Sequence, residues 1–323
     1  MPLVSAIVVN WNGAKHLEIS LPSLLSQSHS PLEVIVVDNA STDDSERAAS
    51  RFGVRWVPLP KNMGLAPALN RGAAAASGEF LLFLNNDMRF PEQFVESLTC
   101  EMVREPDVFS VDALQYDWDG TRQVHLATRL GKRHRANGIC FALVPGLYIY
   151  QESSNSPTAI TSVCAANMLV RKSMFHALGG FDERLPLGYE DVELCWRAWL
   201  RGWKSVFAPA AVCWHRVGGS SNSVEASRLG FRGTCGGRLL AATKLLPLNF
   251  VISTWLASLM GLARDASCLR GQRTLDRLRV FAEYFRCLPA LISDRRALYR
   301  SAHTTPKQHL EHLLRLARES GRN

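Results

Sequence analysis

Residues 80–87 read Phe-Leu-Leu-Phe-Leu-Asn-Asn-Asp, an apolar run that ends in three polar side chains. The same change from apolar to polar occurs along Val4–Asn10 and along Leu32–Asp38. Uninterrupted apolar runs of this length predict strands that are buried on both faces, as in parallel sheets. We therefore expect strands at residues 4–9, 32–37 and 79–84, and a further strand at 54–57.

Helical patterns separate these predicted strands. Leucines recur at helical spacing over residues 17–25, although Pro22 disturbs the pattern. Ser41 and Asp44 resemble a capping box, and residues 65–77 are rich in alanine. Strands that alternate with helices predict an α/β fold, in which helices cover both faces of a mostly parallel sheet.

Polar side chains gather where the predicted strands end. Ligands bind beyond the carboxyl ends of parallel strands, so Asn10, Asp38 and Asp87 are expected on one rim. A single Asp at a strand end is usually a turn residue, but Asp38 could accept a hydrogen bond from the imide N–H of uracil or thymine. Asp87 suits Mg²⁺ or Mn²⁺, which bridges two phosphates and neutralises a departing diphosphate. Arg71 is placed to contact the same diphosphate.

Two blocks of motifs carry a resemblance to a known family. The first block is Val-Val-Asn-Trp-Asn-Gly (8–13), Val-Val-Asp-Asn-Ala-Ser-Thr-Asp (36–43), Asn-Met-Gly to Asn-Arg-Gly (62–72) and Phe-Leu-Asn-Asn-Asp (83–87). The second is Gly-Gly-Phe-Asp-Glu (179–183), Tyr-Glu-Asp-Val-Glu-Leu-Cys-Trp-Arg (189–197) and His215 before Gly-Gly-Ser (218–220). In this order and spacing, over about residues 3–250, they resemble the family 2 glycosyltransferases with the GT-A fold. The chain is most similar to the rhamnosyltransferase-like bacterial branch, which builds polysaccharides and glycolipids.

The resemblance implies a donor site. Its binding residues would be Asn10, Asn12, Asp38, Asn62, Gly64, Arg71, Asn85, Asn86 and Glu190. Asp38 matches the residue that binds the base, and Asp87 matches the last acid of the DxD motif that holds the metal. Asn85 replaces the first acid of that motif, so the site keeps one carboxylate. His215 matches a histidine that ligates the metal or contacts the diphosphate in several relatives.

The resemblance also implies that Asp191 is the catalytic base. An acceptor hydroxyl that attacks an anomeric carbon must lose its proton, and a carboxylate within ~3 Å can accept it. Glu190 and Asp191 open a predicted helix, whose N-terminus stabilises negative charge. The alternative is that both acids merely cap this helix. Glu193 is expected on the helix surface or paired with Arg197.

The implied reaction is a direct displacement with inversion. It moves a sugar from a UDP- or dTDP-sugar, with dTDP-rhamnose favoured by the branch, to a hydroxyl of a saccharide or lipid-linked saccharide in cell-envelope polysaccharide synthesis. The loop at 218–220 is expected to close over the donor. Two alternatives stay open. One is an inactive, nucleotide-sugar-binding membrane scaffold, which the missing first acid favours. The other is a sugar-1-phosphate nucleotidyltransferase, which needs a glycine-rich basic loop that Asn10–Lys15 does not supply.

Positive charge is concentrated at the C-terminal end. Residues 264–323 carry 13 Lys and Arg and 6 Asp and Glu, a net of +7 out of +8 for the whole chain. A near-neutral body argues against a nucleic-acid enzyme with a basic cleft. Leu245–Ala263 lacks charged residues, but Pro247, Asn249 and several hydroxyl side chains dilute it. We expect it to lie on an anionic membrane surface, followed by basic helices. A buried helix or a homo-oligomer contact is the alternative.

These patterns give an organisation and a location. We expect a GT-A domain over residues 1–238 and an apolar, then basic, helical extension over 239–323. The basic stretch at 129–137 and the polar stretch at 151–156 predict that the span between them is a mobile loop region. The eight cysteines show no metal-ligand spacing, and no secretory signal is visible. Reduced thiols and a cytoplasmic protein, peripheral on the inner face of the membrane, are therefore expected.

Overall fold

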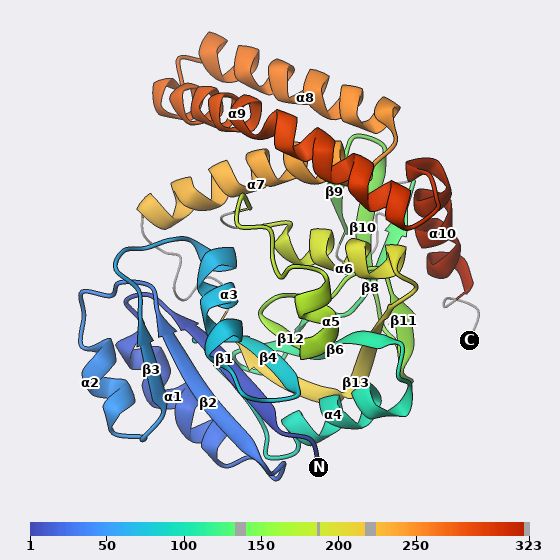
Figure 1. Cartoon of the computed structure of the whole chain (residues 1–323). Helices are drawn as coiled ribbons and strands as arrows, with labels where there is room; N and C mark the ends of the chain where they lie inside the picture. Colours follow the sequence, from blue (N-terminus) through green and yellow to red (C-terminus); the bar gives the residue numbers. More distant parts are fainter. Residues whose placement is uncertain (133–139, 186–187, 217–223, 320–323) are drawn as a thin grey trace.

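The fold is that of a computed structural model, which describes residues 1–132, 140–185, 188–216 and 224–319 (Figure 1). In these residues a ten-stranded sheet carries the predicted rim. Its order is β11 (Thr158–Ile160), β13 (Lys204–His215), β6 (Val108–Asp117), β12 (Asn167–Arg171), β4 (Phe80–Asn85), β1 (Val4–Asn10), β2 (Leu32–Asp38) and β3 (Arg55–Pro58). Two short strands extend it: β5 (Met88–Arg89) pairs with β13, and β7 (Gln123–His125) pairs with β6.

The sheet is parallel where the N-terminal motifs lie. Strands β3, β2, β1 and β4 run in one direction, and the register sets Asn10 opposite Asp38. In the next pair, Asn85 lies opposite Val9. β12 is antiparallel to both β4 and β6, whereas β6 and β13 are again parallel. The four predicted N-terminal strands are confirmed to within one residue at each end.

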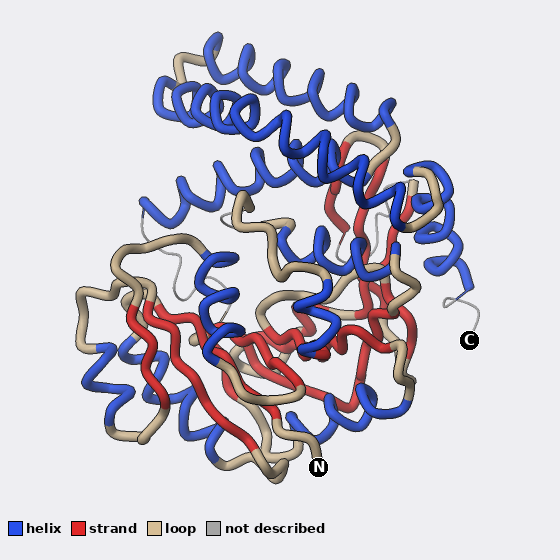
Figure 2. Tube along the Cα trace, in the orientation of Figure 1, coloured by secondary structure: helices blue, strands red, loops and turns tan. Residues whose placement is uncertain are grey.

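Helices cover both faces of the sheet, so the central strands β1, β2 and β4 are buried on both sides (Figure 2). One face packs against α1 (Ala14–Leu25), α2 (Ser45–Ser50) and α4 (Phe94–Arg104). The other packs against α3 (Leu65–Ala75), α5 (Lys172–Ala177) and α6 (Glu190–Leu200). Along β1, Ile7 joins the second core whereas Ala6 and Val8 join the first. This two-sided burial is the reason for the uninterrupted apolar runs.

Two local predictions are wrong. The Ser41 hydroxyl does not cap α2; it donates to Asp38 at 2.5 Å and accepts the Asn12 backbone N–H at 2.8 Å, because a strand-end carboxylate lies closer than the helix. The expected loop region instead contains a three-stranded antiparallel sheet, ordered β8 (Ala127–Gly131), β10 (Leu147–Glu152) and β9 (Cys140–Val144). Arg129, which suggested a solvated loop, is buried in this sheet and donates to the Ala159 carbonyl at 2.5 Å.

Helices make up the C-terminal part of the chain. α7 (Val224–Leu245), α9 (Gly271–Ser301) and α8 (Leu248–Ser267) stack in that order away from the sheets, and α10 (Pro306–Glu319) packs against β8 and β11 (Figure 1). The predicted boundary between residues 238 and 239 falls within α7, and the division into two domains stays a prediction. Among the described residues, no helix has the length and apolar character that crossing a membrane requires.

Gly72 sets how closely α3 approaches the sheet. A Cβ atom at this position would lie 2.3 Å from Cγ2 of Ile7 and 3.0 Å from Cγ2 of Val37. Both neighbours are buried β-branched side chains with little freedom to move. Gly236 on α7 is different, because a Cβ there would meet Val280 at 3.7 Å, an ordinary contact.

Alanine should therefore have opposite effects at these two helical glycines. We expect Gly72→Ala to lower the free energy of unfolding by about 1–3 kcal/mol through overpacking. Gly236→Ala should raise it by about 0.5–1 kcal/mol, because alanine is the better helix former. Urea unfolding followed by circular dichroism measures both; a Gly72→Ala protein as stable as wild type would contradict the close approach.

Candidate active site

A chain of side-chain hydrogen bonds ties together three strand ends at the rim. Asn86 donates through Nδ2 to Oδ1 of Asn10 at 2.7 Å, and Asn10 donates through Nδ2 to Oδ1 of Asp38 at 3.1 Å. Asp38 also accepts the backbone N–H of Ser41 at 3.0 Å. The side chains predicted at the rim are all buried: Asn10, Asp38 and Asp87. The structure thus brings Asn10, Asp38 and Asn86 together, with the Oδ2 edge of Asp38 bonded to a single backbone donor.

The turn before α3 forms the next part of the site. Asn39 donates to Oδ1 of Asn62 at 3.0 Å and accepts the Met63 N–H at 2.8 Å, while Gly64 has a φ of 89° that favours glycine. The turn borders a cavity of about 350 Å³, lined by Trp11, Asn62, Met63, Gly64, Arg228, Leu229 and Arg232. Sequence reasoning missed Asn39, which holds the turn, although it follows the predicted base-binding Asp38 directly.

The side chain of Asp87, which follows β4, lies beside that of His215, the last residue of β13. The His215 Nε2 lies 3.2 Å from Oδ1 of Asp87 and 3.4 Å from Nδ2 of Asn85. On the other side of the ring, Nδ1 lies 3.0 Å from Oε1 of Gln115. The Gln115 amide is itself oriented, because its Nε2 donates to Asn167 at 3.1 Å. In the neutral ring, Nδ1 therefore carries the proton and Nε2 turns its lone pair toward the carboxylate.

This arrangement fits a divalent cation. The carboxylate oxygen of Asp87 and the imidazole nitrogen of His215 lie 3.2 Å apart, and the Gln115 amide fixes the ring, as in many metal sites. No group of three or more His, Cys, Asp or Glu that could hold a metal occurs in the part of the chain that the structure describes. Asp87 and His215 could therefore hold a cation only with further oxygen ligands, which the phosphates of a diphosphate would supply.

Asp191 lies in a second cavity, of about 380 Å³, at the N-terminus of α6. Its carboxylate accepts the backbone N–H of Val192 at 2.7 Å and of Ala165 at 3.2 Å. Burial raises the pKa of Asp191, and these two backbone donors oppose that rise. His125, Gln151, Tyr189 and Thr234 line the same cavity. A hydroxyl bound there could deliver its proton to Asp191.

Glu190, the neighbour of Asp191, has different surroundings. Its side chain is buried, and among the described residues its Oε2 has no hydrogen-bond partner. Burial and the Asp191 carboxylate raise the pKa of Glu190 to about 8. At neutral pH Glu190 is therefore mostly a neutral carboxylic acid, which can donate a hydrogen bond.

His125 was missed by sequence reasoning. Its Nε2 lies 2.7 Å from Oδ2 of the buried Asp112, and its Nδ1 lies 2.8 Å from Nε2 of Gln151. Burial disfavours the charged ring, but the Asp112 carboxylate outweighs this, so the pKa of His125 lies above its usual value. A lone histidine at the end of the three-residue strand β7 gives no periodic signal, and its partners come from β6 and β10.

Glu193 is buried rather than on the surface, and its predicted pairing with Arg197 is confirmed. The two make a bidentate pair at 2.7 Å, and Nζ of Lys244 lies 2.5 Å from Oε1 of Glu193. Arg197 also donates to the carbonyls of Leu178 and Gly180 at 2.5 and 2.7 Å. These contacts connect α6 with the loop before it and with α7.

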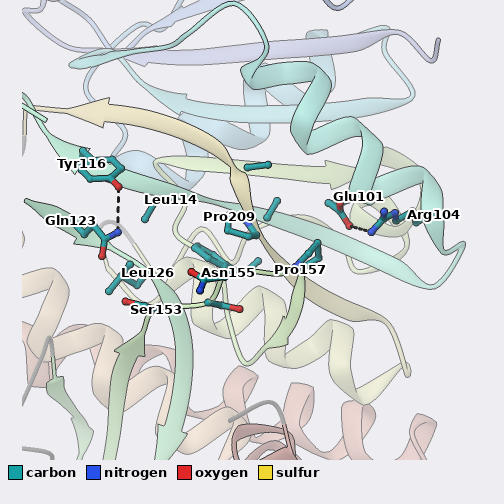
Figure 3. Close-up of a pocket in the computed structure, with 14 residues that line it drawn as sticks. Glu101, Arg104, Leu114, Tyr116, Gln123, Leu126, Ser153, Asn155, Pro157 and Pro209 are labelled. Atoms are coloured by element: carbon teal, nitrogen blue, oxygen red, sulfur yellow. Dashed lines mark hydrogen bonds and ion pairs between the residues drawn. The ribbon is translucent and has the colours of Figure 1, made fainter. Parts of the chain in front are cut away.

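Two predicted residues lie at the edge of these clusters. Arg71 is exposed on α3. Asn12 is exposed at the loop after β1, where its backbone N–H binds Ser41 and its side chain accepts the Thr42 N–H at 2.8 Å. The expected closing loop at 218–220 lies outside the described residues. A further cavity of about 540 Å³ lies beside Tyr116, Gln123 and Pro209 (Figure 3). Its lining, as far as the structure describes it, contains none of the predicted site residues.

Comparison with known proteins gives matches along most of the chain. Residues 5–179 match the family described as Glycosyl transferase family 2. An N-acetylglucosaminyl-diphospho-decaprenol L-rhamnosyltransferase of Mycobacterium tuberculosis is 30% identical over 247 residues, which cover 70% of this chain and 80% of that protein. The O-antigen biosynthesis protein RfbC of Myxococcus xanthus is 33% identical over 219 residues, 64% of this chain and 16% of that protein.

Two solved structures share the fold. GalNAc-T7 with UDP, GalNAc and Mn²⁺ has a TM-score of 0.57 and 16% identity, covering 76% of this chain and 48% of that one. A mannosyltransferase from Pyrobaculum calidifontis in complex with GDP-Man and Mn²⁺ has a TM-score of 0.54 and 18% identity, covering 99% and 86%. The predicted GT-A fold with C-terminal helices is confirmed, and both of these proteins contain Mn²⁺.

The raised pKa of Glu190 predicts a pH-dependent stability. Between about pH 4.5 and 8 the folded protein keeps a proton that the unfolded chain loses, so the free energy of unfolding falls as the pH rises. Glu190→Gln removes this dependence. Relative to wild type, we expect the free energy of unfolding of the variant to increase by about 1–4 kcal/mol when the pH is raised from 5 to 9. Urea unfolding at both pH values measures this, and the exposed Glu46→Gln is the control. A gain no larger than that of the control would refute the assignment.

Proposed function

The chain belongs to the family 2 glycosyltransferases, and we propose that it transfers a sugar from a UDP- or dTDP-sugar to an acceptor hydroxyl, with inversion. The observation that carries this proposal is that the dipeptide Ala165–Ala166, between β11 and β12, contacts both Asp191 and Asn85. The Ala165 N–H binds the Asp191 carboxylate at 3.2 Å, while the Ala166 carbonyl accepts the Asn85 N–H at 3.1 Å. A single dipeptide thus joins the base to the donor motif.

Each side of this dipeptide has its own chemistry in the proposal. On the donor side, Asp87 and His215 would hold a divalent cation, which would neutralise the charge of the departing diphosphate. On the other side, Asp191 takes the proton of the acceptor hydroxyl as that oxygen attacks the anomeric carbon. A single carboxylate beside the acceptor suits one in-line displacement, which inverts the anomeric centre. Glu190, as a neutral acid, is able to donate a hydrogen bond to a substrate oxygen.

The substrates are proposed from the similar proteins. The name of the mycobacterial enzyme states a rhamnosyl transfer to an N-acetylglucosaminyl-diphospho-decaprenol. We extend this to dTDP-rhamnose as the favoured donor, and to a lipid-linked saccharide of cell-envelope polysaccharide synthesis as the acceptor. Family membership disfavours the nucleotidyltransferase alternative. It also favours an active enzyme over an inactive scaffold, and the Asp87, His215 and Asp191 clusters support this choice.

Replacement of the base tests the proposed reaction. Asp191→Asn keeps the size of the side chain but cannot accept the proton, so we expect transfer to fall by about 100-fold or more, with the donor dissociation constant changed less than about 3-fold. Release of nucleoside diphosphate and calorimetric titration of donor measure the two effects. Asp119→Asn, exposed on the turn after β6, is the control. Near-normal turnover by Asp191→Asn would remove Asp191 from this role.

The C-terminal helices support a peripheral position at a membrane. Apolar side chains three or four residues apart are exposed along α8: Leu248, Ile252, Leu256, Leu259 and Met260. On α9 a second exposed row contains Leu275, Leu278, Phe285 and Ile292. Basic residues such as Arg264 and Arg286 are also exposed on these helices. Apolar rows flanked by arginines fit the surface of an anionic bilayer, where a lipid-linked acceptor resides. We propose the inner face of the cell membrane.

Acidic substitutions in the α8 row test membrane binding without removing any helix. We expect the double variant Leu256→Glu and Met260→Glu to bind vesicles containing one-third anionic lipid at least 10-fold more weakly than wild type, as measured by co-sedimentation. Val103→Glu, an exposed apolar position on α4, should leave binding unchanged. If the double variant binds vesicles normally but turns a dimeric wild type into a monomer in analytical ultracentrifugation, the row is a contact between copies instead.

A further inference from the structure

α7 forms one wall of the cavity beside Trp11 and the turn at 62–64. Arg228, Leu229 and Arg232 lie within four residues of one another on this helix and face Trp11 and the turn at 62–64. The turn contains Asn62 and Gly64, both predicted to bind the donor. The opposite wall therefore comes from the C-terminal helices, more than 160 residues further along the chain. It carries two guanidinium groups.

Acidic residues of α9 hold both arginines in place. Arg228 donates through Nε and Nη2 to the two carboxylate oxygens of Asp276, at 3.2 and 3.1 Å. Arg232 pairs with Glu283 through Nη2. The Nε–H of Arg232 is buried and, among the described residues, has no hydrogen-bond partner. A buried guanidinium donor without an acceptor is costly, so this N–H is available to an oxygen atom of a ligand.

A nearby pair shows what a purely structural contact between these helices looks like. Arg277 of α9 donates to Asp265 of α8 at 2.7 Å, and its guanidinium packs against Gly261 and over the ring of Phe231. This pair lines none of the cavities described above.

The chemistry of the cavity wall matches a nucleoside diphosphate. The planar donors of arginine fit phosphate oxygens, and an indole ring such as that of Trp11 provides a face on which a base can stack. We infer that Arg228 and Arg232 are donor-binding residues, which contact the phosphates of the nucleoside diphosphate and hold it between α7 and the Trp11 loop. This inference rests on the proposed function and adds α7 to the donor site.

The test compares ligands with and without phosphate. Using the full chain, UDP, dTDP, GDP and CDP are titrated by calorimetry, together with the nucleoside of whichever diphosphate binds best. We expect Arg232→Gln to weaken the binding of the diphosphate on the order of 10- to 100-fold. The affinity for the nucleoside should change less than about 2-fold, because the nucleoside lacks the phosphates.

Matched variants separate binding from folding. The double variant Arg228→Gln with Asp276→Asn removes one arginine while leaving a neutral hydrogen-bonding pair, so no buried carboxylate is left unpaired. This double variant should weaken the binding of the diphosphate in the same way. Its unfolding temperature should stay close to that of wild type. Arg273→Gln, exposed on α9, removes the same charge and should change nothing.

The outcomes distinguish this inference from the proposal beneath it. If the wild type binds a nucleoside diphosphate and both arginine variants bind it equally well, the inference is wrong and the proposed function stands. If the variants weaken nucleoside and diphosphate alike, the arginines only shape the cavity, and the inference is again wrong. Failure of the wild type to bind any of the four diphosphates would overturn both.

Discussion

The buried carboxylate of Glu193 is the constraint on which the geometry of the site depends. It lies one turn into α6, fully buried, and bonds with both Arg197 and Lys244. A charge in this position without its partners would cost several kcal/mol, so the structure has little freedom to separate them. Arg197 also binds the carbonyls of the loop at 178–180, and Lys244 belongs to α7. One ion cluster therefore fixes the helix that presents Asp191, the loop before it and the helix above it.

From this fixed helix, two adjacent acids meet different surroundings. Asp191 receives two backbone N–H groups, which stabilise its charged form, whereas Oε2 of Glu190 finds no partner among the described residues. The backbone before α6 is also held in an unusual conformation. Tyr189 has a φ of 70°, a left-handed conformation that costs a non-glycine residue about 1–2 kcal/mol. Its hydroxyl donates to the Leu143 carbonyl and accepts from Arg238 of α7, so contacts from outside α6 support this conformation.

The sequence predicts the parts of this protein that depend on local pattern. The strands of the parallel half and the polar residues at their ends follow from apolar runs, and the register then places Asn10 beside Asp38. The polar pairs of the site are a different matter. Gln115 orients His215 across 100 residues of sequence. The two residues meet because β6 pairs with β13, and no sequence periodicity predicts that contact. Ser41 shows the same limit, because a nearby carboxylate outcompetes the helix end that its spacing suggested. Arg129 suggested a loop but is buried within a sheet.

α7 borders two of the cavities. Arg232 lines the cavity beside Trp11, and Thr234, two residues later, lines the cavity that contains Asp191. A helix is stiff over so short a distance, and Gly237 seats it closely against the backbone of Gly188. A ligand that displaces or orders α7 in one cavity must therefore alter the other. In an enzyme that holds donor and acceptor in these two places, their binding free energies are coupled, and linkage makes that coupling reciprocal. An affinity measured for either substrate alone then differs from the affinity that operates during turnover.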